Sequence, residues 1–141
     1  MYYAIDAARL SEGSAGVPIG AALLNSNGRL ISSGHNCEIQ SDSSIPHAIL
    51  DCLMNVDPAI SLSDYSIYTT HSPCIMCAGA IILFKLGRVV IGSSGEHPSA
   101  VDILKNNGIN VEFVKSSECE NMLANFFENN PNSWKRNCAR H

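Results

Sequence analysis

A hairpin near the start of the chain constrains the fold more than any other feature of the sequence. The apolar segment Val17–Leu24 is compatible with a strand, and Asn-Ser-Asn-Gly follows it at positions 25–28. Asn and Gly adopt the positive φ angles that tight turns need, so we expect Arg29–His35 to return as an antiparallel strand. Strand and helix patterns then alternate to the end of the chain. A hairpin followed by β-α-β crossovers predicts an α/β fold, a three-layer α/β/α sandwich with a five-stranded mixed sheet.

The remaining elements follow from apolar spacing and from Gly and Pro at their ends. The expected helices are Met1–Gly13, a helix from Pro46 that ends before Pro58, Cys74–Leu86 with Gly87 as its cap, Ala100–Asn106 and Glu118–Phe127. The other expected strands are Tyr65–Thr70, Arg88–Gly92 and Ile109–Val114. We expect loops at Gln40–Ser44 and Ser93–Ser99, and one more helical turn in the tail Pro131–His141.

Length and charge limit the classes of function. A chain of 141 residues has room for a single domain, here residues 1–141. The net charge of -4 disfavours extended nucleic-acid binding. The apolar run Ala78–Phe84 is too short to span a membrane, and the N-terminus lacks the pattern of a signal peptide. We therefore expect a cytoplasmic protein, whose six cysteines are free thiols or metal ligands rather than disulfides.

The strongest chemical signal is Cys74-Ile75-Met76-Cys77, which Pro73 precedes. Two thiolates on the first turn of a helix are half of a tetrahedral zinc site. His47, near the start of the preceding helix, is well placed as a third ligand, and the fourth position would stay open as in catalytic sites. We expect one zinc ion per chain. A redox pair or two core cysteines are the alternatives for the same spacing.

These residues resemble the pattern of the cytidine/cytosine deaminase superfamily, a histidine-containing motif followed downstream by Pro-Cys-x-x-Cys. The similarity to fungal cytosine deaminases extends over nearly the whole chain. It is carried by Gly16–Gly20, Gly34–Asn36, Tyr68–Thr70, Ser72–Cys74, Met76-Cys77, Gly79–Ile82 and Pro131–Trp134.

The resemblance implies a zinc-dependent hydrolase of a small heterocycle, with a cytidine deaminase-like fold and a homodimeric assembly. It places the zinc ligands at His47, Cys74 and Cys77. It also implies that Asn36 binds the edge of the substrate, that Ser72 contributes to the same pocket, and that Trp134 closes the pocket.

Two positions depart from the pattern of that family. The family has a glutamate two residues after the histidine, where this chain has Ile49. That glutamate is the general acid and base, and general acid–base catalysis contributes roughly 10²–10⁴ in rate. The family also has an aspartate three residues after the pocket tryptophan, where this chain has Asn137, which can donate as well as accept hydrogen bonds.

Other side chains are candidates for a role at this site. Asp51 lies four residues after His47, so it shares a helix face and could orient the ring or act as a distant base. His71 ends a strand beside the Pro-Cys-x-x-Cys segment and is a second candidate base. His97 lies in a polar loop that could contact a ligand. Each also has a structural interpretation, and Glu38 is expected to face solvent.

Three functional hypotheses follow. The chain could be a zinc enzyme that deaminates or otherwise hydrolyses a small nitrogen heterocycle or related cyclic metabolite, with proton transfer supplied differently. It could use zinc as a Lewis acid on a carbonyl or imine. It could instead be a catalytically inactive pseudo-deaminase that serves as a binding or partner subunit. The apolar helix Gly79–Leu86 indicates a homodimer.

Overall fold

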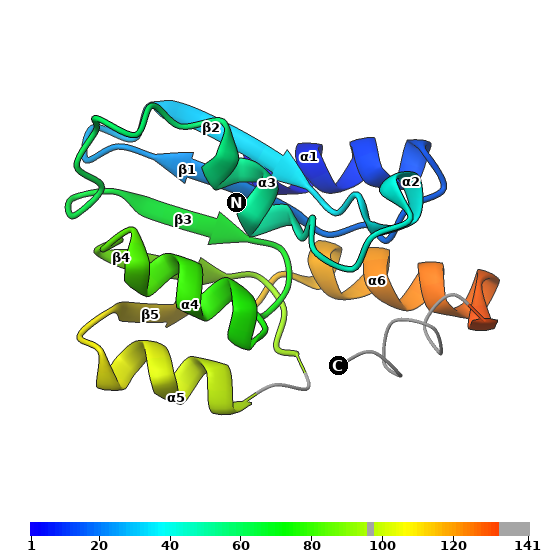
Figure 1. Cartoon of the computed structure of the whole chain (residues 1–141). Helices are drawn as coiled ribbons and strands as arrows, with labels where there is room; N and C mark the ends of the chain where they lie inside the picture. Colours follow the sequence, from blue (N-terminus) through cyan, green and yellow to red (C-terminus); the bar gives the residue numbers. More distant parts are fainter. Residues whose placement is uncertain (96–97, 133–141) are drawn as a thin grey trace.

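The structure is a computed structural model that describes residues 1–95 and 98–132 (Figure 1). Helices and strands alternate after an N-terminal helix and a hairpin. They are α1 (Tyr2–Gly13), β1 (Gly20–Leu24), β2 (Leu30–His35), α2 (Glu38–Ser41), α3 (Ala48–Met54), β3 (Ser66–Thr69), α4 (Ile75–Leu83), β4 (Arg88–Ile91), α5 (Pro98–Asn106), β5 (Asn110–Phe113) and α6 (Ser117–Asn129). None of these helices, which cover the described residues only, is long and apolar enough to cross a membrane.

The strands form one sheet in the order β2-β1-β3-β4-β5. β1 runs antiparallel to both β2 and β3, whereas β3, β4 and β5 run parallel. The predicted hairpin is confirmed: Gly28 has a φ of 76°, and the Asn25 side chain accepts hydrogen bonds from the backbone N–H groups of Asn27 and Arg29. The five-stranded mixed sheet is therefore the one that the sequence predicts.

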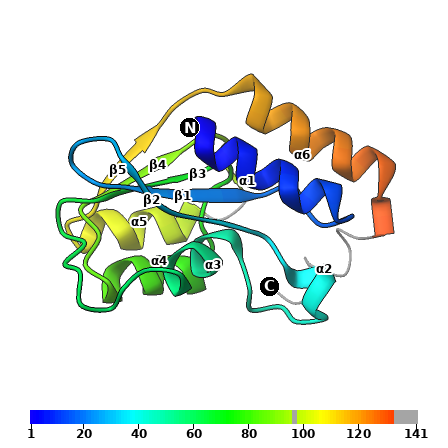
Figure 2. The same ribbon diagram turned by 90° about the horizontal axis from the view of Figure 1, so that it is seen from above.

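Helices cover both faces of the sheet, as a three-layer sandwich requires. Figure 2 shows α1 and α6 on one face and α3, α4 and α5 on the other. Buried aliphatic side chains from the sheet and the second helical layer form the larger core, which includes Leu23, Ile67, Ile81 and Leu104. A smaller cluster of Val17, Leu123 and Phe126 packs under α6.

Some local details differ from the expectations: α5 begins at Pro98, inside the segment Ser93–Ser99 that was expected as a loop. The segment expected as a loop from Gln40 begins in the one-turn helix α2, which is too short for apolar spacing to reveal. The left-handed residue after α4 is Lys85, with a φ of 55°, and not the expected Gly87. Gly87 is needed for space instead, because a Cβ there would lie 2.1 Å from the carbonyl oxygen of Ser63.

The topology brings two helix starts to one edge of the sheet. Since β1 is antiparallel to both β2 and β3, those two strands end at the same edge. The chain after β2 leads to α3, and the chain after β3 leads to α4 (Figure 1). Gly34 in β2 lets α3 pack closely, since a Cβ at that position would lie 2.2 Å from the backbone nitrogen of Cys52. The start of α3 is thereby held at this edge of the sheet.

Candidate functional site

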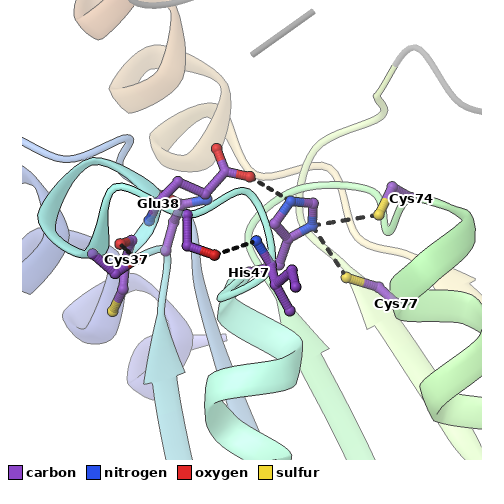
Figure 3. Close-up of polar contacts among 9 residues, drawn as sticks. Cys37, Glu38, His47, Cys74 and Cys77 are labelled. Carbon is purple, nitrogen blue, oxygen red and sulfur yellow. Dashed lines mark hydrogen bonds and ion pairs between the residues drawn. The ribbon is translucent and has the colours of Figure 1, made fainter. Parts of the chain in front are cut away.

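Three side chains that could hold a metal ion meet where α3 and α4 begin (Figure 3). The Nδ1 atom of His47 lies 3.4 Å from Sγ of Cys74 and 3.5 Å from Sγ of Cys77. Tetrahedral zinc with Zn–S of about 2.3 Å and Zn–N of about 2.0–2.1 Å separates such ligand atoms by about 3.5 Å. The geometry and the donor chemistry of the group therefore fit zinc.

The helix starts hold these side chains in place. His47 is the N-cap of α3 and Cys74 is the N-cap of α4, and both have extended backbone angles. Cys77 lies on the first turn of α4 and is 3% exposed. Backbone N–H groups at a helix start favour negative charge, which stabilises thiolates at this position.

The three side chains of this group change one another's pKa values. Hydrogen bonds from Cys77 and from His47 lower the pKa of Cys74 to about 3 despite its burial. The shared hydrogen bond with Cys74, together with burial, raises the pKa of Cys77. Burial lowers the pKa of His47, but hydrogen bonds to Cys74 and Glu38 outweigh burial and raise it to about 9. A divalent cation bound by these side chains would displace the protons on His47 and Cys77.

Glu38 is a side chain of this site whose position differs from the expectation. It was expected to face solvent, but its side chain is only 6% exposed, and its Oε1 atom lies 2.5 Å from Nε2 of His47. The one-turn helix α2 turns Glu38 toward the imidazole (Figure 3). No periodic spacing connects positions 38 and 47, so only the fold reveals the pair.

Asp51, the other carboxylate considered for His47, faces a different neighbour. It lies one turn along α3, and its Oδ2 atom accepts a hydrogen bond of 3.0 Å from the backbone nitrogen of His35. Asp51 is not among the residues that line the cavity at the metal-binding group. The carboxylate that contacts the ring is that of Glu38.

A cavity opens beside the metal-binding group. Its described lining residues come from the loop before β1, the end of β2, the starts of α2 and α3, and the β3–α4 connection: Val17, Ile19, Asn36, Glu38, His47, Ala48, Ile49, Thr69, His71, Ser72, Pro73, Cys74 and Cys77. The structure thus gathers seven of the sequence-predicted site residues around one space. His97, Trp134 and Asn137 lie outside the described residues.

Asn36 is held rigidly in the wall of this cavity. It is 4% exposed, its backbone nitrogen donates to the carbonyl of Ile19, and its carbonyl accepts from the Ser11 hydroxyl at 2.7 Å. Its side-chain oxygen accepts from the backbone nitrogen of Glu38 at 3.2 Å. An amide fixed in this way is suited to recognise the polar edge of a ligand.

Ile49 forms an apolar part of the same wall. It is 2% exposed and lies two residues after His47 on the first turn of α3. The side chain can exclude water from the cavity but cannot transfer a proton. Any proton transfer in this cavity therefore has to come from another side chain.

Comparison with known proteins identifies the family. Residues 1–93 match the cytidine and deoxycytidylate deaminase zinc-binding region. The chain belongs to this deaminase family. It is 36% identical over 133 residues to the cytosine deaminase of Candida albicans, covering 93% of this chain and 89% of that protein. It is 33% identical over 140 residues to the tRNA-specific adenosine deaminase of Buchnera aphidicola subsp. Schizaphis graminum, covering 92% of each.

The solved structures agree in fold. The guanine deaminase from Nitrosomonas europaea superposes with a TM-score of 0.74 at 23% identity, covering 89% of this chain and 81% of that chain. The family model describes a zinc-binding region, and His47, Cys74 and Cys77 form a group that could hold such an ion in this chain.

Proposed function

We propose that this protein is a zinc-dependent hydrolase of the deaminase type that acts on a small nitrogen heterocycle. One observation carries the proposal: a His/Cys/Cys group of tetrahedral spacing opens onto a cavity that also contains Asn36 and Ser72. A purely structural zinc site is closed by a fourth protein ligand, whereas catalytic sites keep one position open.

His47, Cys74 and Cys77 are the proposed zinc ligands. When bound, zinc would supply the Lewis acidity that such hydrolases use to activate water. Glu38 would keep the imidazole in the tautomer whose Nδ1 lone pair faces the metal, since the Nε2–H group donates to its carboxylate. The carboxylate of Glu38 would thus orient the zinc ligand His47 and would not contact the substrate.

The other cavity residues would bind the substrate and move its protons. Asn36 presents a fixed amide to the edge of a heterocycle, and Ile49 forms an apolar wall that keeps bulk water out. Apart from the proposed ligands, the titratable side chains of the described cavity lining are Glu38 and His71. Because Glu38 already pairs with His47, His71 is the proposed general base.

The relatives support a heterocycle that carries an amino group. Their names specify cytosine, guanine and tRNA adenosine as substrates. A free base fits this chain better than a tRNA, because the net charge of -4 provides no general attraction for phosphates. The proposed reaction is hydrolytic release of ammonia from a free amino heterocycle.

An inactive pseudo-deaminase is the second candidate, and the buried Ile49 is the observation that favours it. Loss of the acid–base glutamate removes a contribution of roughly 10²–10⁴ in rate. In that case the cavity would still bind a heterocycle for a partner subunit.

An ammonia-release assay distinguishes the two candidates. Zinc-loaded protein is incubated with cytosine, adenine, guanine and 2,6-diaminopurine, and the zinc-free protein and the His71→Gln variant are assayed in parallel. The enzyme hypothesis expects zinc-dependent ammonia release from at least one base, with kcat lowered at least about 100-fold by His71→Gln. Heterocycle binding that raises the melting temperature without any turnover would favour the inactive subunit.

A further inference from the structure

A second group of potential metal ligands lies outside the cavity. It consists of His35 at the end of β2, Cys37 just before α2, and Asp51 on α3. One ligand atom from each side chain lies within 4.8 Å of the other two. We propose that His35, Cys37 and Asp51 form a second binding site for a divalent metal ion with the ligand preferences of zinc.

The distances within this group suit direct coordination. Sγ of Cys37 lies 3.4 Å from Nδ1 and 4.0 Å from Nε2 of the His35 ring. Tetrahedral zinc would separate a thiolate and an imidazole nitrogen by about 3.5 Å, between these two values. Nδ1 of His35 also lies 3.1 Å from the carbonyl oxygen of Asn36, so Nε2 is the proposed ligand atom, and Asp51 adds a carboxylate as the third donor.

The donor set also has the right chemistry. One thiolate, one imidazole and one carboxylate are all established zinc ligands, whereas calcium and magnesium require oxygen donors. All three side chains are partly exposed, so an ion and a water molecule as fourth ligand can enter from solvent. The site is therefore proposed for zinc chemistry.

The side chains of the second group do not line the cavity. Along the segment after β2, Asn36 and Glu38 line the cavity, whereas His35 and Cys37 do not. Figure 3 shows Cys37 pointing away from His47 while Glu38 points toward it. Neighbouring side chains of this segment thus serve two separate groups, and the second group goes beyond the proposed function.

The surroundings of Cys37 favour its protonated thiol, and the negative charge of Asp51 is the part of them that would attract a cation. Burial raises the pKa of the Cys37 thiol, and the carboxylate of Asp51 raises it further. Asp51 uses one oxygen for the backbone nitrogen of His35, and Cys37 donates to the carbonyl of His35. These hydrogen bonds hold the three residues close together, and a bound ion would displace the proton that Cys37 donates.

A metal at this position would fasten the end of β2 to α3. The segment between His35 and Glu38 carries Asn36, the proposed substrate ligand, and Glu38, the partner of His47. With one thiolate instead of two, the second site should bind more weakly than the His47 group. A second ion should therefore be absent after dialysis and return when metal is added.

Titration with Co²⁺ tests the proposal. Dialysed, zinc-loaded protein is titrated with Co²⁺, and thiolate-to-cobalt charge-transfer absorption is recorded while released zinc is measured with a chromogenic chelator. We expect saturable absorption without zinc release. Cys37→Ser keeps a hydroxyl donor for His35 but should abolish the absorption. Asp51→Asn keeps an acceptor for His35 and should raise the Kd more than about tenfold, because even outer-shell changes cost 10- to 100-fold.

Matched controls separate metal binding from folding defects. Cys119→Ser removes a buried thiol from α6, and Asp102→Asn removes an exposed carboxylate from α5, so both should titrate like the unchanged protein. Melting temperatures without added metal show that the variants are folded. The proposal would be overturned if no absorption appeared, or if the absorption persisted in Cys37→Ser. It would also be overturned if the absorption were matched by zinc release from the His47 group.

Discussion

The carboxylate of Glu38 lies 2.5 Å from Nε2 of His47, on the ring edge opposite to the atom that faces the two cysteine sulfurs. In the zinc-bound protein this pairing would fix the tautomer and the orientation of the imidazole, which are the two properties that a metal ligand needs. The side chains of Glu38 and His47 are only 6% and 14% exposed, so the interaction is weakly screened by solvent.

Replacement of Glu38 should weaken zinc binding. Glu38→Gln keeps the size and an acceptor oxygen but removes the charge, so we expect zinc affinity to fall about 10- to 100-fold. Competition with a chelator of known affinity measures the change. Glu112→Gln is the matched control, because Glu112 is half-exposed and pairs with Arg88 on the sheet. Equal zinc affinities in both variants would contradict the role of Glu38.

Zinc binding to metal-free protein should release protons. At pH 7 the His47 imidazole is protonated because its pKa is raised to about 9, Cys77 is a thiol because its pKa is raised, and Cys74 is already a thiolate because its pKa is lowered to about 3. Zinc needs two thiolates and a neutral imidazole, so each ion should displace about two protons.

The apparent zinc affinity should accordingly increase with pH. Two displaced protons correspond to about 100-fold per pH unit between about pH 6 and 8, with affinity lost as the pH falls. Calorimetric titration in buffers of different ionisation enthalpy counts the protons. A count near zero would show that the metal-free site is already fully deprotonated.

The sequence predicts most of the fold because each element carries its own local pattern. The Asn-Gly turn fixes the hairpin, and apolar spacing reveals the longer helices. The group of His47, Cys74 and Cys77 was also predictable, since the topology of β2 and β3 requires both following helices to begin at one edge. Short-range patterns and simple topology were sufficient for these features.

Contacts between distant segments could not be predicted in the same way. Glu38 meets His47 only because a single helical turn, α2, reverses the chain after β2. The spacing of four residues pointed to Asp51, which instead accepts from the backbone of His35. Helical spacing identifies residues on one face but not which neighbour that face meets.

The exposed side chains of α4 should hold a homodimer together. Ile75 is 60%, Leu83 77% and Phe84 41% exposed at the two ends of this helix. Exposed apolar side chains along one helix and at its C-cap favour association with a second copy. We expect a dimer at micromolar concentration by sedimentation velocity and a monomer for Leu83→Glu. Leu10→Glu, which changes a 64% exposed leucine in α1, should remain dimeric. A monomeric unchanged protein would reject this assembly.

Ile49 offers the sharpest test of the chemistry. Its side chain is 2% exposed and lines the cavity two residues after His47, so Ile49→Glu would add a carboxylate beside the proposed zinc ligands. We expect the unchanged protein to deaminate cytosine negligibly and Ile49→Glu to gain activity, up to the roughly 10²–10⁴ of general acid–base catalysis. Ile49→Gln introduces a side chain that is similar in shape to glutamate but cannot transfer protons, so this variant should gain no deaminase activity.

A second substitution tests the substrate-binding position that the resemblance to the family implies. Asn137→Asp restores the acidic acceptor implied by the family pattern, so the double variant with Ile49→Glu should exceed either single variant in ammonia release from cytosine. Near-zero release from all variants would mean that the pocket has diverged toward another substrate or toward binding alone. Rapid turnover by the unchanged protein would show that another group supplies the base. His71→Gln should then abolish that turnover, and the argument from the absent glutamate would fail.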